Sequence, residues 1–147
     1  MENQNTGKNG AISLPVQSLN WKNVKTKKLR RIIFQFDVAA TARNEKSFEL
    51  VAYPLYKIKR EWTVGEKITL EPGKDGGKVE LPLPLTLGNL EVDIKKIKKC
   101  IKTGKEVFTL MPYHYDKNPH AAYTLLDESG QTVASANPCP PGRPLSD

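Results

Sequence analysis

The chain has 147 residues, a formal net charge of +7 and two cysteines. A chain of this length buries roughly two-thirds of the surface that it exposes when unfolded, so it can fold around one core without metals or disulfides. Residues 1–20 lack the apolar run of a Sec signal peptide, and no stretch approaches the about 18 apolar residues that cross a membrane. We therefore expect a soluble protein that is cytoplasmic or part of an assembled particle.

The basic residues are unevenly distributed. Residues 116–147 hold two basic and four acidic side chains, which leaves −2 there and +9 over residues 1–115. Clusters of this kind attract acidic partners, although interspersed lysines also keep ordinary β-proteins soluble. The excess forms three clusters, made up of Lys22, Lys25, Lys27, Lys28, Arg30 and Arg31; Lys57, Lys59 and Arg60; and Lys95, Lys96, Lys98, Lys99, Lys102 and Lys105.

Both ends of the chain differ from its middle. Residues 1–20 are rich in Asn, Gln, Gly and Ser, and residues 138–147 contain four prolines. Neither composition supplies much core, so we predict a polar N-terminal arm over 1–20, a folded domain over 21–137 and a Pro-rich tail over 138–147.

The dominant hydrophobic period between these ends is two, as expected of half-buried strands. RIIFQFDVAA, for example, places Ile32, Phe34, Phe36 and Val38 on one face. Short strands without long crossover helices predict an all-β fold, an antiparallel β-sandwich of Ig-like or jelly-roll-like type with about eight strands. The predicted strands are 32–40, 48–58, 66–71, 78–87, 90–101, 106–115, 121–127 and 131–136.

Two turns follow from the glycines between these strands. The loop PGKDGG predicts a hairpin between 66–71 and 78–87, and DESG predicts another between the last two strands. The stretch LPLPLTL, residues 81–87, alternates leucine with Pro82, Pro84 and Thr86. Proline removes a backbone donor, so we interpret it as an edge strand that pairs through its leucine amides and resists pairing on the proline side.

Residues 90–102 fit two structures. A helix is favoured by Asn89 as a cap, by Gly104 as a terminator and by a stripe of Leu90, Ile94, Ile97 and Ile101. A strand with a bulge near Lys95 is favoured by the alternation of Leu90, Val92 and Ile94. We prefer the strand because its neighbours are strands, and keep one short helix as the alternative.

The segment PYHYDKNPHAAY holds the residues with most potential for ligand chemistry. His114, Asp116 and His120 are candidate metal ligands, but a closed zinc site needs four, and Asn118–Pro119 already indicates a turn. We predict no metal and no other cofactor. Tyr113, Tyr115 and Tyr123, with Trp62, could form an aromatic platform for a sugar or a base, although core tyrosines are commoner.

The basic run WKNVKTKKLRR indicates contact with a phosphate backbone or another acidic surface, without the pattern of any specific nucleic-acid module. The alternative is a solvated entry to the next strand. Neither GxSxG, HExxH nor a phosphate loop occurs, Cys100 among isoleucines resembles a small buried hydrophobe, and we predict no enzyme activity. The candidate partner-binding residues are Lys25, Lys27, Lys28, Arg30, Arg31, Lys95, Lys96, Lys98 and Lys99.

Two functions remain open. The first is a structural or adaptor protein that docks on a protein partner, or within a virion-like or secretion-apparatus-like assembly, through strand edges and terminal arms. The alternative is a binding module for an anionic polymer such as nucleic acid, or for a glycan, through the basic clusters and the Tyr-rich loop. Cys100 and Cys139 are most simply two reduced thiols, with one bridge as the alternative.

Overall fold

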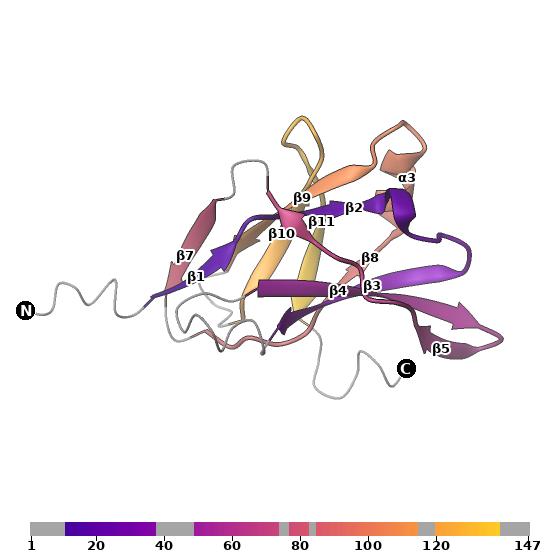
Figure 1. Ribbon diagram of the computed structural model, residues 1–147, viewed down its shortest axis with the longest axis horizontal. Helices are drawn as coiled ribbons and strands as arrows, with labels where there is room; N and C mark the ends of the chain where they lie inside the picture. The colour runs from indigo at the N-terminus through magenta and orange to yellow at the C-terminus, as the bar shows by residue number, and fades with distance from the viewer. Residues whose placement is uncertain (1–10, 38–48, 74–76, 83–84, 115–119, 139–147) are drawn as a thin grey trace, which may run out of the picture.

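The computed structural model describes residues 11–37, 49–73, 77–82, 85–114 and 120–138. The protein is all-β, as predicted, with one short α-helix and one 3-10 turn among the described residues (Figure 1). The elements are β1 (Ala11–Pro15), β2 (Gln17–Asn20), η1 (Trp21–Asn23), β3 (Leu29–Asp37), β4 (Glu49–Ile58), β5 (Glu61–Val64), β6 (Glu71–Pro72), β7 (Lys78–Pro82), β8 (Leu90–Asp93), α3 (Lys95–Ile101), β9 (Val107–Tyr113), β10 (Ala122–Leu126) and β11 (Thr132–Pro138).

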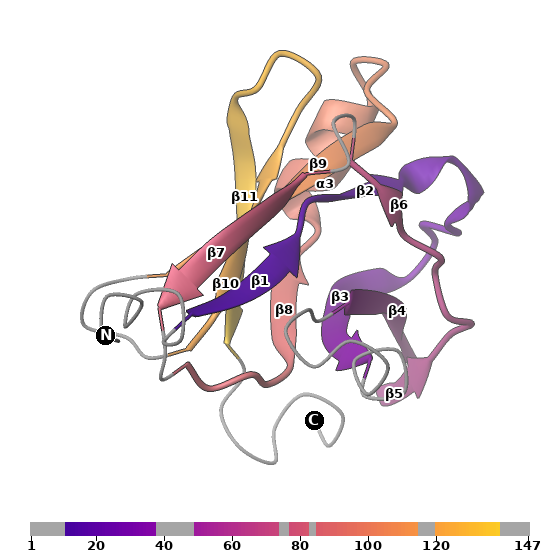
Figure 2. The same cartoon turned by 60° about the vertical axis from the view of Figure 1, so that its left-hand side comes forward.

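Nine of these strands form one antiparallel sheet, in the order β5-β4-β3-β8-β11-β10-β9-β2-β6, and β1 pairs with β7 in a second sheet of two strands. The large sheet curls around the core (Figure 2), which is the usual consequence of strand twist accumulating over many strands. This arrangement does not confirm the predicted type of two-sheet sandwich. The predicted hairpin across DESG is confirmed, because β10 pairs with β11 and Gly130 adopts a φ of 85° in the turn.

The interior of the curl is filled by alternate residues of almost every strand. Phe34, Phe108, Leu110 and Tyr123 are fully buried, and Ile97 of α3 packs in the same cluster. Because the side chains of a strand alternate between faces, each strand also has an outer face, and the outer face of β3, β4 and β5 carries the site described below.

The N-terminal segment makes a larger contribution than its composition predicts. Residues 11–20, assigned above to a polar arm, form β1 and β2, and Leu14 and Leu19 are fully buried. The alternation in AISLP and QSLN is the physical reason, since it places apolar side chains on one face between the polar ones. The prediction of a polar arm is therefore wrong for residues 11–20, which belong to the folded domain. Residues 1–10 lie outside the described part of the chain.

The predicted hairpin across PGKDGG is wrong. Strand β6 pairs with β2 and β7 pairs with β1, so both lie along the N-terminal segment and not along each other. Hydrogen bonds from Val16 N to Gly77 O and from Gly73 N to Val16 O continue this pairing between the two strands. Strands β6 and β7 thus pair with the N-terminal strands β2 and β1, where the prediction had paired them with each other.

LPLPLTL lies partly in β7, which ends at Pro82. Strand β7 pairs only with β1 among the described strands, with Leu81 opposite Ile12, so the edge position is confirmed. Leu81 is buried, Leu85 and Leu87 pack against the core, and the predicted strand does not extend to residue 87. Residues 83 and 84, including the second proline, lie outside the described residues.

Residues 90–101 contain both structures that the sequence allowed. The predicted strand is correct over β8, where Leu90 and Val92 are buried, but wrong beyond Asp93, because α3 begins at Lys95. The proposed cap Asn89 is also wrong, because Asp93 Oδ1 instead accepts a hydrogen bond from Lys95 N at 2.9 Å. The chain leaves the sheet where β3 stops pairing with β8, at the Arg31–Asp93 pair, and Gly104 then follows the helix with a φ of 96°.

The two arms of the curl meet at one buried amide. Gln17 of β2 donates from Nε2 to Leu50 O at 3.3 Å, and its Oε1 accepts from Leu50 N at 3.2 Å. Leu50 lies in β4, at the other end of the sheet order, so the Gln17 side chain occupies the position that a neighbouring strand would fill. We call this contact the Gln17 seam.

Candidate anion-binding site

A hairpin between β4 and β5 builds one side of the site. Lys57 pairs with Trp62 across the hairpin, so both side chains project from the same face of the sheet. The two central turn residues, Lys59 and Arg60, have φ values of 51° and 73°. Positive φ at both positions matches the turns that join two-residue hairpins, which usually contain Asn-Gly or Asp-Gly. The chain leaves β5 through Gly65, where a Cβ would lie 2.7 Å from the Tyr56 ring.

Trp62 lies under two cations. The Lys57 ammonium is 4.6 Å from the centre of the Trp62 ring, and the Arg31 guanidinium is 5.1 Å from it. Both distances lie in the range of cation–π attraction, which holds the positive groups over the indole ring. Trp62 itself is half-buried, and its indole N–H is buried without an acceptor among the described residues.

The three basic clusters of the sequence meet at this point. A pocket of about 420 Å³ opens between the start of β3, the β4–β5 hairpin and the junction of β8 with α3. Its size is in the range of small-molecule and nucleotide sites. We call it the Trp62 pocket, and its lining includes Trp62 and five cations, Arg30, Arg31, Lys57, Lys95 and Lys98.

Few of these charges are neutralised. Arg31 forms an ion pair with Glu91 at 3.4 Å, and Lys98 Nζ donates to the backbone oxygen of Leu29 at 3.2 Å. Arg30, Lys57 and Lys95 have no ion pair with any residue that the structure describes. The one acidic residue in the lining is Asp93, so the pocket has an excess of positive charge.

The remaining predicted basic residues lie outside this pocket. Lys25 and Lys27 line a second, larger hollow of about 880 Å³ beside Tyr56 and the 65–71 segment. Lys28 lies in the preceding turn, where its carbonyl accepts from Lys57 N, and Lys96 and Lys99 are exposed on α3. Four of the candidate basic residues line the same pocket, namely Arg30, Arg31, Lys95 and Lys98.

The structure does not bring the predicted aromatic platform together. Tyr123 is fully buried, its hydroxyl donates to Pro15 O at 3.3 Å, and burial raises its pKa far above the usual value. Tyr113 lies half-buried on β9, which five strands separate from β5 and Trp62 in the sheet order. Tyr115 lies outside the described residues.

The candidate metal ligands are only partly described. His114 and His120 are half-buried, and Asp116 lies outside the described residues. Within the described ranges, no group of three His, Cys, Asp or Glu side chains is close enough to hold a metal ion. Cys100 is a half-buried free thiol on α3, and Cys139 again lies outside the described residues.

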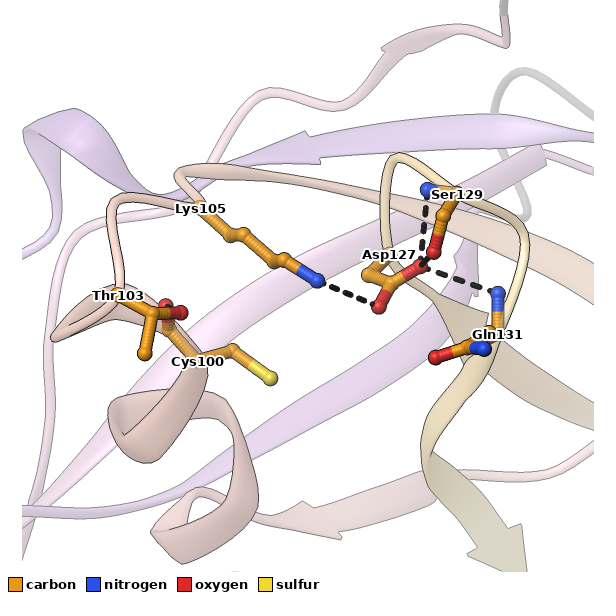
Figure 3. A network of polar contacts seen from close by, with 6 residues as sticks. All are labelled: Cys100, Thr103, Lys105, Asp127, Ser129 and Gln131. Atoms are coloured by element: carbon orange, nitrogen blue, oxygen red, sulfur yellow. Dashed lines mark hydrogen bonds and ion pairs between the residues drawn. The ribbon is translucent and has the colours of Figure 1, made fainter.

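A separate polar network joins the loop after α3 to the last hairpin (Figure 3). Lys105 Nζ contacts Asp127 Oδ2 at 2.8 Å, while Asp127 Oδ1 accepts from Ser129 N, Ser129 Oγ and Gln131 N. The hydrogen bond from Lys105, followed by that from Ser129, lowers the pKa of Asp127 well below its usual range. These bonds all close a turn and its neighbouring loop, so we assign the network to stability.

The described helices include none with the length and apolar content needed to cross a membrane. Comparison with family models, curated proteins and solved structures gave no match. The site is therefore characterised by its own geometry: an indole ring, five cations and one carboxylate around a pocket.

Proposed function

We propose that this protein is a binding module that docks an anionic polymer at the Trp62 pocket. One observation carries the proposal: three basic segments, far apart in sequence, each contribute a side chain to the same pocket. Lysines that serve only solubility gain nothing from converging on one site, because like charges brought together repel. A polyanion offsets that repulsion and releases its own counterions.

Backbone strain near the pocket supports the same conclusion. Among the described non-glycine residues, positive φ occurs at Lys28, Lys59 and Arg60, and all three are basic. A left-handed conformation costs an L-residue about 1–2 kcal/mol, whereas Gly or Asn adopts it more readily. Charges kept at such positions despite this cost fit a binding role, since strained residues often lie at functional sites.

A charge-reversal pair tests the proposal. Arg30→Glu/Lys95→Glu changes two exposed residues of the pocket, and Lys22→Glu/Lys78→Glu makes the same change of charge away from it. Binding of labelled heparin and of single-stranded DNA should weaken at least about tenfold more in the first variant. Equal weakening in both variants would show that only net charge matters and would refute a site at the pocket.

Docking of a protein strand is the second candidate, favoured by one feature of the β5 edge. Strand β5 ends the sheet order, and Val64 and Ile58 of this hairpin are 46% and 39% exposed. An extended partner segment can add to such an edge through backbone hydrogen bonds, in an adaptor or an assembled particle. Affinity of this kind should change little between about 50 and 300 mM salt, whereas polyanion binding should fall steeply.

A further inference from the structure

We infer that the polymer bound at the Trp62 pocket is a single-stranded nucleic acid, with one unstacked base against the Trp62 indole. The inference rests on the proposed function and makes it more specific, because it names the ligand and the group that the pocket takes. Its carrying observation is the juxtaposition of a half-buried aromatic ring with five cations in one pocket.

The geometry suits a nucleotide because a nucleotide has a flat ring and an anionic phosphate close together. Lys57 and Arg31 lie over the ring, 4.6 and 5.1 Å from its centre, so a base that stacks on the indole takes the place of one of these cations and brings its phosphate within reach of both. Single-strand binders commonly combine a stacking aromatic with a basic groove along the backbone. Asp93, also in the lining, accepts from Lys95 N through Oδ1, which leaves its Oδ2 as an acceptor for a ligand.

Other anionic polymers use only part of this site. The bases of a duplex are stacked inside the helix and do not present a face to an indole. A sulfated glycan supplies charge without a π-system, and an acidic peptide supplies carboxylates at the end of flexible side chains. Each of these ligands would contact the cations and leave Trp62 without a specific role, which is what the test exploits.

The size of the Trp62 ring suits it to stacking, because an indole offers a base a larger π-face than a phenyl ring does. Its N–H is buried without an acceptor among the described residues, but so is the N–H of Trp21 in the core. The exposure of the Trp62 ring, and not its unpaired donor, is therefore what separates the two tryptophans.

The test compares Trp62→Phe and Trp62→Ala with the natural protein in two binding assays. The probes are a labelled oligothymidylate of about 12 nucleotides and labelled heparin, read by fluorescence anisotropy. We expect Trp62→Ala to weaken oligonucleotide binding by about 5- to 150-fold, the range for loss of one stacked base. The affinity of Trp62→Phe should lie between those of the natural protein and Trp62→Ala. Heparin binding should change less than about twofold in either variant.

Intrinsic fluorescence provides an independent readout. The second tryptophan, Trp21, is 2% exposed, so the oligonucleotide should quench Trp62 and the quenching should disappear in Trp62→Phe. Thermal unfolding checks that each variant is folded. If Trp62→Ala does not fold, the binding of Trp62→Phe decides the test. The inference fails if Trp62→Phe binds the oligonucleotide as tightly as the natural protein and retains the quenching.

The failure of this inference can be distinguished from that of the proposed function. If heparin and oligonucleotide bind equally well to all Trp62 variants, but Arg30→Glu/Lys95→Glu loses both, the polyanion site stands and the base-stacking claim is refuted. The same is true if a duplex of matched length competes as well as the single strand. If the charge-reversal variant binds both ligands normally, both proposals are wrong.

Discussion

Gln17 shows how much one side chain can contribute to closing a sheet. Its amide satisfies both backbone groups of Leu50, at 3.2 and 3.3 Å, in a position where it is only 6% exposed. An asparagine would be too short for this reach by one methylene, and an apolar residue would satisfy neither group. The amide supplies one donor and one acceptor, which is what the edge of β4 requires there.

Replacing Gln17 with Met should therefore lower the free energy of unfolding by about 2–4 kcal/mol. The side chain keeps its length, but Leu50 N–H and C=O remain buried without their partner, and such groups are costly. Urea unfolding measures the change, with Ser18→Ala of the same strand as a control that should stay within about 1 kcal/mol. A Gln17→Met protein as stable as the natural one would show that the seam contributes little.

Asp127 makes stability depend on pH. Its pKa is lowered in the folded protein, chiefly by Lys105 and Ser129, so its contribution is present above the ordinary carboxyl pKa and is lost as the pH falls below it. The pKa of Lys105 is raised, mainly by the same hydrogen bond, so its contribution is present at neutral pH and is lost in strong alkali. Neutral pH thus lies inside the window where both groups stabilise the turn.

Lys105→Met should lower the thermal midpoint at pH 7. The difference from the natural protein should shrink as the pH falls below the ordinary carboxyl pKa of about 3.9, because the unfolded state then gains a proton that the folded natural protein resists most strongly. Lys102→Met is the matched control, because Lys102 is exposed and has no ion pair among the described residues. If the effect of Lys105→Met is the same at pH 7 and at low pH, the ion pair does not stabilise the fold.

At the scale of the element, we expect the β4–β5 turn to trade stability for binding. Lys59 and Arg60 occupy positions that favour Asn and Gly, next to the pocket that we assign to polyanions. Lys59→Asn/Arg60→Gly should raise the free energy of unfolding by about 1 kcal/mol or more and weaken polyanion binding. If the variant is more stable and binds polyanions as tightly as the natural protein, Lys59 and Arg60 do not contribute to the site.

Lys59→Gln/Arg60→Gln serves as the control for that experiment. It removes the same two charges but keeps side chains that disfavour positive φ, so it should lose affinity without gaining stability. Equilibrium unfolding and anisotropy titrations of both variants give the two quantities independently. The two variants together therefore separate the effect of charge from the effect of backbone conformation.

The same turn shows why the sequence predicted only part of this fold. Alternation is strong in RIIFQFDVAA and SFELVAYPLYKI, and β3 and β4 lie where it predicts them. Lys59–Arg60 lacks the Asn-Gly signal of a two-residue turn, so β5 was missed, and the glycines of PGKDGG predicted a hairpin where the strands have other partners. Pairing between distant strands, such as β1 with β7, is not specified by any local pattern.

The site was predictable in composition but not in location. The basic clusters and Trp62 were identified from the sequence, yet no spacing rule brings residues near 30, 60 and 95 together. That requires the order β5-β4-β3-β8, which places the hairpin, the start of β3 and the end of β8 side by side. Lys57 was counted as a charge and not as a site residue for the same reason. A predicted β4–β5 hairpin would have placed Lys57 opposite Trp62 and so indicated that Lys57 belongs to the site.

At the scale of the whole molecule, the β4–β5 hairpin and the β1–β7 pair lie on opposite sides, as both views show (Figures 1 and 2). Lys57 and Trp62 of that hairpin line the Trp62 pocket. The pocket carries the excess of positive charge, while β7 presents an edge that ends in a proline. This separation leaves the proposed binding face clear of the N-terminal strands β1 and β2, which close the core. The outside of β3, β4 and β5 is thus the face to which we assign the proposed polyanion binding.

The most direct test of a binding site at the Trp62 pocket is an amide and indole NMR titration with oligothymidylate. We predict that the largest shifts occur at the Trp62 indole N–H and at the backbone of Arg31, Lys57 and Lys98, with Trp21 and β7 unchanged. Shifts concentrated instead around Lys25 and Lys27, or spread evenly over every lysine-bearing surface, would contradict the assignment of this pocket as the binding site.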